Sequence, residues 1–338
     1  MTDQAETPAT RPPHAFRWDL DKTYLHTEFD TLLDIVRTAV EKPERKRTVA
    51  GAAWMIREVR AHTDARITII SGSPEQMRAS IEAKLRLDGV QWDEFVLKPS
   101  LRSVLRFRFR ALRDQVGYKL PALLAARATT PPECLETCFG DDAEADALVY
   151  SLYADILGGR VSPETLRAVM TAANSYPDVI EQAVDLAAKT PAHDPVRRIF
   201  INLERRSDPA FFHRYGARVV PVRNYFQAVL VLIEDGVLPA VSARNIVEAL
   251  ALTQVFSDEE LAESAHELVR RGALSHASVT SASEQLAAGD EGHHRLAEVL
   301  ARAPEQGEAP AYPEIDYVAA LNDDRARWEE ARAQARRK

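Results

Sequence analysis

Short apolar runs that end in polar residues recur through the first 150 or so positions of the chain. Four such runs are candidate strands, at residues 16–18, 66–70, 94–97 and 135–139. Helical patterns lie between them, at residues 49–60, 74–87 and 120–128. Because strands alternate with helices, the pattern predicts an α/β fold in which helices cover both faces of a Rossmann-like parallel sheet.

Polar clusters follow directly after three of these candidate strands, at residues 19–23, 71–74 and 140–146. In an open parallel sheet the carboxyl ends of the strands share one edge, and ligands bind outside that edge. Residues that are far apart in the sequence can therefore meet there. The sequence predicts one functional site assembled from these three clusters.

The rest of the chain is predicted to be mainly helical. Residues 1–14 are expected to be a disordered tail, and 15–235 an α/β domain with a helical insertion at about 157–196 and late strands at 198–203 and 217–222. A helical extension at 236–302 and a linker with a charged helix at 303–338 follow. Capping signals support helices that begin after Ser162 and Ser257. No repeat of fixed period is evident.

The composition and charge of the chain argue against several classes of function. A formal net charge of -8 argues against broad nucleic-acid binding, which depends on neutralising many phosphates. The two cysteines, Cys134 and Cys138, lack the number and spacing of a disulfide framework or a zinc site. No segment has the length of a membrane span or the pattern of a signal peptide, which predicts a cytoplasmic protein.

The first polar cluster carries the chemistry. Asp19 and Asp21 follow a strand at a spacing of two, so one turn can direct both carboxylates into one pocket. One carboxylate can attack phosphorus while the other protonates the leaving alcohol and then activates water. An isolated Asp-x-Asp is more typical of a solvated turn. The other clusters therefore decide the interpretation.

Those clusters resemble the motifs of the haloacid dehalogenase superfamily, in the same order. Residues 18–23 read WDLDKT, which is similar to the first motif, and Ser71 closes the second strand as the second motif requires. Lys119 is similar to the lysine of the third motif, in the first turn of a helix. Residues 140–146, GDDAEAD, resemble the acidic fourth motif. The resemblance covers about residues 16–156 and implies a Mg²⁺-dependent phosphatase fold with small cap insertions.

The resemblance also implies a role for each residue. Asp19 is the expected nucleophile and Asp21 the general acid and base. Mg²⁺ is expected to be bound by Asp19, a backbone oxygen near Asp21, and Asp141, since it prefers hard oxygen ligands. Ser71 and Lys119 are expected to contact the phosphoryl group, whose negative charge needs compensation.

Further residues are expected to support these. Thr23, Asp142 and Asp146 are candidates for orienting the metal ligands or the lysine, with Asp146 favoured over Asp142. Gly72 is a candidate substrate-binding residue. Lys98 also follows a strand and competes with Lys119 as the phosphate-binding lysine.

A narrower resemblance is to the phosphatidate phosphatase branch known from an actin-patch protein. It is carried by residues 71–74, SGSP, and by the spacing of Gly140, Asp141, Asp146 and Tyr150. The chain departs from that branch at Lys22, where an acidic residue is usual, in an Arg-rich insertion and in its long helical portion. The resemblance therefore supports phosphatase chemistry more directly than a lipid substrate.

The insertion carries an arginine stripe on one face of a predicted helix bounded by Ser100 and Gly117. Its members are Arg102, Arg106, Arg110 and Arg113. Such a stripe is typical of a solvated, salt-bridged surface. Beside an active site it also fits capture of an anion or a lipid headgroup, with Arg106 and Arg110 as the contacts.

The expected function is hydrolysis of a phosphomonoester through a phosphorylated Asp19. The expected partner is a phosphorylated small molecule or a lipid headgroup, with peripheral membrane contact in the second case and no nucleic acid. Two alternatives stay open: a catalytically weak protein whose helical half is a protein-interaction module with an unspecified partner, and phosphotransfer to an acceptor other than water.

Overall fold

The computed structural model describes residues 13–26, 43–98, 111–288 and 293–335. A parallel six-stranded sheet with strand order β3-β2-β1-β4-β5-β6 forms its centre. The strands are β1 (His14–Asp19), β2 (Arg66–Pro74), β3 (Glu94–Lys98), β4 (Leu135–Asp141), β5 (Val196–Asn202) and β6 (Val219–Val222). The order reverses at β1 and β4, so the two strands that carry the acidic clusters lie side by side in the middle of the sheet.

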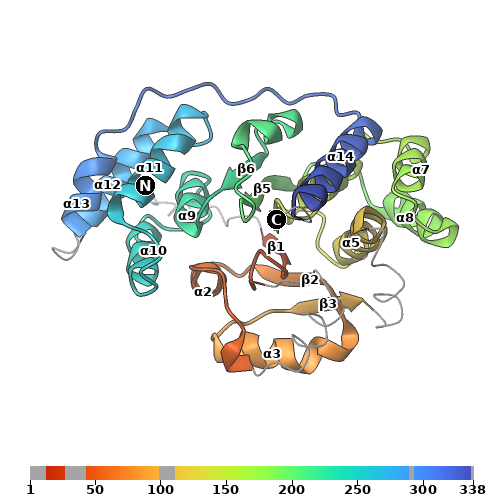
Figure 1. The fold of residues 1–338 in the computed structure, drawn as a ribbon, viewed down its shortest axis with the longest axis horizontal. Coiled ribbons are helices and arrows are strands. Elements are labelled where there is room, and N and C mark those ends of the chain that lie inside the picture. The colour runs from red at the N-terminus through yellow and green to blue at the C-terminus, as the bar shows by residue number, and fades with distance from the viewer. Residues whose placement is uncertain (1–12, 27–42, 99–110, 289–292, 336–338) are drawn as a thin grey trace, which may run out of the picture.

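Helices cover both faces of the sheet (Figure 1). One face packs against α2 (Ala52–His62), α3 (Arg78–Leu87) and α9 (Tyr225–Glu234). The other packs against α5 (Ala111–Ala128) and α6 (Asp146–Leu157), on which α7 (Pro163–Ala172), α8 (Pro177–Lys189) and α14 (Tyr317–Ala335) pack in turn. Short 3₁₀ helices lie at Pro43–Arg45, Glu75–Met77 and Pro209–Tyr215. The predicted α/β fold with a parallel sheet is confirmed.

Side chains alternate along β1 between the two faces, as a strand requires. Trp18 packs on the α2 and α9 side, where its ring stacks on Phe139 with centroids 3.9 Å apart. Arg17 points to the opposite face and is completely buried. Asp19 follows at the carboxyl end of the strand, on the same side as Arg17. The core packing of β1 therefore fixes the position of Asp19.

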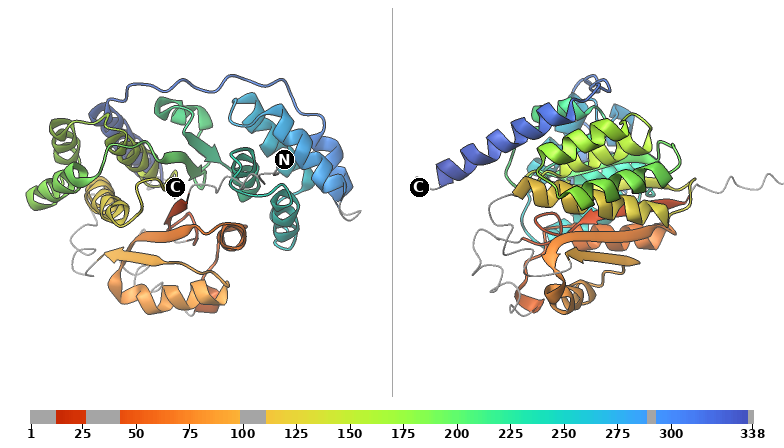
Figure 2. Two further views of the ribbon diagram at one scale, coloured as in Figure 1. Left: turned by 180° about the vertical axis from the view of Figure 1, so that it is seen from behind. Right: turned by 90° about the vertical axis from the view of Figure 1, so that its right-hand side faces the viewer.

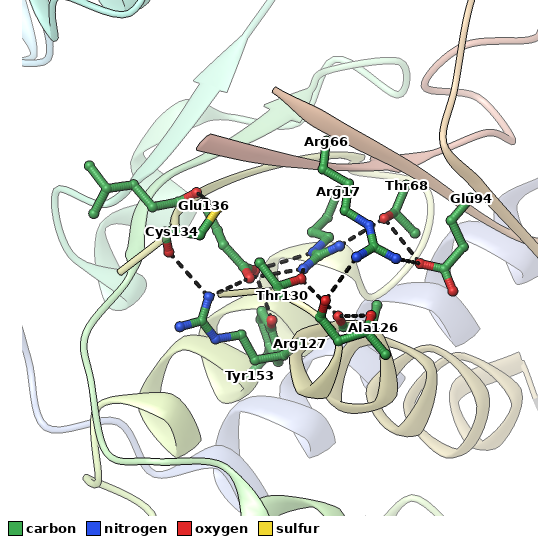
Figure 3. A network of polar contacts seen from close by, with 12 residues as sticks. Arg17, Arg66, Thr68, Glu94, Ala126, Arg127, Thr130, Cys134, Glu136 and Tyr153 are labelled. Atoms are coloured by element: carbon green, nitrogen blue, oxygen red, sulfur yellow. Dashed lines mark hydrogen bonds and ion pairs between the residues drawn. The ribbon is translucent and has the colours of Figure 1, made fainter. Parts of the chain in front are cut away.

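A buried polar network surrounds Arg17 beneath the α5 and α6 layer (Figure 3). Its guanidinium donates two hydrogen bonds to Glu136, at 2.9 and 3.3 Å, and both residues are fully buried. The remaining donors reach the hydroxyls of Thr68 and Thr130 at 2.7 and 2.8 Å. Tyr153 donates to the second Glu136 oxygen at 2.7 Å. Because buried charges are costly unless paired, this network joins β1, β2, β4, α5 and α6 into one arrangement.

The helical extension contains α10 (Ser242–Ala251), α11 (Asp258–Arg270), α12 (His276–Ala287) and α13 (His294–Leu300). Two of its turns are equivalent: Gly236 after α9 and Gly272 after α11 are 36 positions apart, both with left-handed φ, of 71° and 67°. Each turn forms the same three backbone hydrogen bonds to the helix that precedes it. Gly89 after α3 and Gly159 after α6 form the same three bonds, so this arrangement is a common way of ending a helix and not a repeat of the chain.

A segment without helix or strand connects α13 to α14, as predicted for residues 303–313. It runs across the top of the molecule, from the helical extension to the opposite side of the sheet (Figure 1), and Figure 2 shows the same path from behind. Tyr312 and Tyr317, at the far end of this path, both donate hydrogen bonds to Asp155 of α6, the second at 2.6 Å. These contacts attach α14 to α6.

Several predictions need correction. His14, assigned to the disordered tail, begins β1, where its ring lies 2.9 Å from the Thr137 hydroxyl. Gly117 does not end a helix, because α5 continues through it and through Pro121 to Ala128. A Cβ at Gly117 would lie 3.0 Å from the Ser175 hydroxyl, so the glycine serves close packing rather than termination.

Most of the arginine stripe lies outside the residues that the structure describes. Arg102, Arg106 and Arg110 lie outside the described residues, and the proposed contacts of Arg106 and Arg110 stay predictions. Among the described helices, none is both long and apolar enough to cross a bilayer.

Candidate active site

The predicted polar clusters converge at the carboxyl edge of the sheet. Asp19 ends β1, Asp141 ends β4, and Ser71 lies near the end of β2. Helix α5 brings Lys119 over this edge, and α6 begins at Asp146. The site thus takes its side chains from three strands and two helices, as expected for an open parallel sheet.

Lys119 lies at the centre of the site and is 1% exposed. Its ammonium group is 2.8 Å from Asp19 Oδ1 and 2.9 Å from Glu144 Oε2, and it also contacts Asp146 Oδ1. Lys98 is placed differently, with its ammonium 5.5 Å from the centre of the Tyr118 ring. Of the two lysines considered from the sequence, Lys119 is therefore the one that contacts Asp19. It sits in the middle of α5 rather than in the first turn of a helix.

Four carboxylates surround that lysine and form a candidate metal centre. Asp19, Asp141, Glu144 and Asp146 each offer an oxygen, and these oxygens all lie within 4.8 Å of one another. Asp141 Oδ1 accepts the backbone N–H groups of Ala143, at 2.6 Å, and Glu144, at 3.0 Å. This turn after β4 brings Glu144 back towards the strand end.

Two oxygens of this cluster are buried without compensation. Asp19 Oδ2 and Asp141 Oδ2 have no hydrogen-bond partner among the residues that the structure describes. Buried carboxylate oxygens are normally paired or coordinate a metal. Hard carboxylate oxygens at this separation fit a divalent cation such as Mg²⁺. Asp19 and Asp141 are accordingly the residues that would hold the ion, with Glu144 at its side.

The electrostatics of the cluster support the same conclusion. Burial raises the pKa of Asp19 and of Asp141 well above the ordinary aspartate value, and the neighbouring carboxylates raise both further. Burial opposes the charge of Lys119, but the surrounding carboxylates prevail and raise its pKa. For Glu144, the nearby Lys119 outweighs burial and lowers the pKa. One ammonium group does not compensate four carboxylates, so additional positive charge would stabilise the ionised site.

Gly140 explains how Asp146 enters the site. A Cβ at position 140 would lie 2.5 Å from Asp146 Cβ and 2.5 Å from its Oδ2, closer than any side chain tolerates. The bare backbone therefore lets the start of α6 approach the end of β4. From there Asp146 Oδ2 accepts the backbone N–H of Asp141 at 3.1 Å while Oδ1 contacts Lys119. Asp146 thus orients both the lysine and the end of β4.

Asp21 lies beside the carboxylate cluster rather than in it. Its Oδ2 accepts hydrogen bonds from the hydroxyls of Ser71, at 2.9 Å, and Ser73, at 3.3 Å. The Ser71 hydroxyl in turn accepts the backbone N–H of Ser73 at 3.0 Å. The two aspartates of the first motif therefore have different surroundings, acidic and lysine-bound for Asp19 and hydroxyl-lined for Asp21. Different surroundings are what two different chemical roles require.

The remaining predicted residues have structural contacts. Asp142 is buried, and its carboxylate accepts the backbone N–H groups of Arg205, at 2.7 Å, and Ser207, at 3.0 Å, so it anchors the loop after β5. Thr23 is buried, and its carbonyl accepts the Tyr225 hydroxyl at 2.8 Å.

Gly72 lies in van der Waals reach of Lys98. The nearest atom to a Cβ built there is the Lys98 ammonium nitrogen, 3.9 Å away.

Sequence reasoning missed Glu144 and Ser73 as site residues. Both lie inside motifs that it had singled out, at 140–146 and 71–74. The missing information was the turn geometry: only the fold of residues 141–144 shows that Glu144 reaches Lys119.

Comparison with known proteins adds no identification: no protein-family model, no curated protein and no solved structure matches this chain. The geometry of the site is therefore the basis for any functional conclusion.

Proposed function

We propose that this protein is a Mg²⁺-dependent phosphohydrolase of the haloacid dehalogenase type, which cleaves a phosphomonoester through a phosphorylated Asp19. The observation that carries the proposal is the buried Asp19 carboxylate, paired with Lys119 on one oxygen and unpartnered among the described residues on the other. A carboxylate held in this way by a cation is a suitable nucleophile for phosphorus.

The chain's own residues supply most of the chemistry. Asp19 forms a bond to phosphorus as the bond to the ester oxygen breaks, and Asp21 gives its proton to the leaving alkoxide. In the second step Asp21 takes a proton from a water molecule, whose oxygen attacks phosphorus and releases phosphate from Asp19. The hydroxyls of Ser71 and Ser73 hold Asp21 in place for both transfers. Lys119 lies where it would offset the negative charge that gathers around phosphorus.

A bound Mg²⁺ would supply charge neutralisation between Asp19 and an anionic phosphate. Asp19 and Asp141 would hold it through their carboxylates. Asp146 would keep Lys119 in position, since its two oxygens contact the lysine and the backbone of Asp141. Phosphoryl transfer depends mainly on positioning and charge, and this site offers both.

The proposal is tested by assaying a chromogenic aryl phosphate with Mg²⁺ and with a chelator, in the parent protein and in Asp19→Asn. Hydrolysis should require Mg²⁺ and should be abolished by Asp19→Asn, because the amide is neither nucleophilic nor an anionic ligand. Activity retained in a folded Asp19→Asn protein would refute the mechanism.

A second variant separates the roles of the two aspartates. Asp21→Asn should slow hydrolysis of alkyl phosphates, whose leaving groups need a proton, more than that of activated aryl phosphates. An equal loss over leaving groups of graded pKa would show that Asp21 is not the acid.

A further inference from the structure

Lys22 has an unusual backbone conformation in the turn that follows β1. Its φ is +61°, in the left-handed region that favours glycine and asparagine. Its N–H donates to the Leu25 carbonyl at 2.7 Å, and its own carbonyl accepts the side-chain amide of Asn202 at 3.1 Å. The fold thus holds a lysine, three residues after Asp19, in a conformation where glycine would be easier. Backbone outliers of this kind cluster at active sites and ligand-binding segments.

The loop after β5, residues 203–207, lies next to this turn. Asn202 joins the two segments, and His26 is 3.6 Å from Glu204. The backbone amides of the loop are held by Asp142, so the loop has a fixed course beside the carboxylate cluster. Within it, Arg206 also has a left-handed φ, of +56°. Two basic residues close to the site therefore adopt conformations that their side chains do not favour.

Three cationic side chains lie on these two segments. Within the described residues, the side chains of Lys22, Arg205 and Arg206 form no ion pair or hydrogen bond. Lys22 is half-buried, and both arginines are exposed. Lys22 follows the end of β1, and the loop follows Asn202, which pairs with Asp141 in the sheet, so both segments lie at the carboxyl edge beside the carboxylate cluster. In a chain of net charge -8, three basic residues beside the carboxylate cluster form a local exception.

We propose that Lys22, Arg205 and Arg206 form a second anion subsite, and that the substrate is a phosphomonoester that carries a second phosphate group. The inference rests on the phosphohydrolase function proposed above and specifies its substrate class. Arginine and lysine side chains bind phosphate oxygens through charge-assisted hydrogen bonds, which are stronger than neutral ones. One phosphate would lie at Asp19 and the other at the basic subsite, which would make Lys22 a specificity-determining residue.

The test compares two soluble probes that differ by one phosphate, propyl phosphate and propane-1,3-diol bisphosphate, in the presence of Mg²⁺. Lys22→Gly removes the charge but keeps a residue suited to the left-handed conformation, so we expect the variant to fold. Its kcat/KM for the bisphosphate should fall about 10- to 100-fold, mainly through KM, as expected when a charged hydrogen bond is lost. Its kcat/KM for propyl phosphate should change less than about threefold.

Three further variants serve as controls. Lys22→Arg should keep the preference for the bisphosphate because it keeps the charge. The double variant Arg205→Gln with Arg206→Gln should lose part of that preference. Arg302→Gln, which removes an exposed arginine from the helical extension, should leave both substrates unaffected.

The outcomes separate this inference from the function on which it depends. If the parent hydrolyses both probes equally and Lys22→Gly lowers both equally, Lys22 only balances the carboxylates, and the subsite is refuted while the hydrolase function stands. If the parent hydrolyses neither probe with Mg²⁺, the proposed function itself fails. A preference for soluble inositol 1,4-bisphosphate over vesicles containing phosphatidylinositol 4-phosphate would assign the second phosphate to a soluble metabolite, and the reverse preference to a lipid headgroup.

Discussion

Replacing Lys119 with methionine tests the electrostatic account of the site. The substitution keeps the length of the side chain in α5 but removes the ammonium group that contacts Asp19, Glu144 and Asp146. Three buried or partly buried carboxylates then lose their common counter-charge. Without a metal, the folded protein has to tolerate their mutual repulsion or protonate them.

Removal of one partner from a buried ion pair typically costs about 3–5 kcal/mol of stability. Lys119 is 1% exposed and Asp19 and Asp146 are fully buried, so solvent screening does not reduce this cost. Because one ammonium group serves all three contacts, the losses are not additive. We therefore expect Lys119→Met to lower the free energy of unfolding by about 3–5 kcal/mol in the presence of a chelator.

Urea unfolding, followed by circular dichroism with a chelator and with Mg²⁺, measures this effect. Mg²⁺ should stabilise Lys119→Met more than the parent, since the ion replaces the missing positive charge. Turnover should stay low in the variant even with Mg²⁺, because the lysine no longer contacts the nucleophile. Lys98→Met is the matched control and should change stability by less than about 1 kcal/mol. A free energy of unfolding of Lys119→Met within about 1 kcal/mol of the parent, with and without Mg²⁺, would refute the reasoning.

Three further predictions concern other parts of the structure. Gly140→Ala should lower kcat/KM about 100-fold, because the added Cβ displaces Asp146 from Lys119; an unchanged value in a steady-state assay would contradict this steric account. Glu136→Gln should lower the free energy of unfolding by about 3–5 kcal/mol, because it leaves the guanidinium of Arg17 buried without a charge partner. Denaturant unfolding measures this loss, and an unchanged free energy would exclude it. Burial raises the pKa of Asp324 to about 6 in the folded protein, above the ordinary aspartate pKa. Above pH 6 the buried, ionised carboxylate therefore lowers the free energy of unfolding, and this loss disappears as the pH falls towards the ordinary aspartate pKa. Asp324→Asn should therefore raise the melting temperature near pH 8 but not near pH 4, and an equal change at both would exclude the buried charge as its cause.

The sequence predicted the sheet well because the signal is local. Each strand is a short apolar run followed by polar residues, and both late strands were found at their positions as β5 and β6. Convergence at the carboxyl edge follows from parallel topology alone, which is why Asp19, Ser71 and Asp141 could be assigned to one site. These expectations needed no knowledge of side-chain contacts.

The start of α5 was not predictable in this way. Gly117 and Pro121 are local helix breakers, and the sequence analysis placed helix boundaries at them. In the structure the glycine lies close to Ser175, in the connection between α7 and α8, and tertiary packing overrides the local preference. Lys119 was therefore placed correctly at the site but wrongly within its helix.

Contacts that depend on a turn were also beyond sequence reasoning. Glu144 reaches Lys119 only because the amides after Asp141 fold back onto its carboxylate.

The measurement that tests the central claim most directly is trapping of the phosphorylated residue. The protein would be mixed with a phosphomonoester and Mg²⁺, quenched with borohydride, digested and sequenced by mass spectrometry, since borohydride reduces an aspartyl phosphate to homoserine. The account predicts homoserine at position 19, dependent on both substrate and Mg²⁺, and none in Asp19→Asn. Homoserine at another aspartate, or steady hydrolysis with Asp19 unmodified, would contradict it.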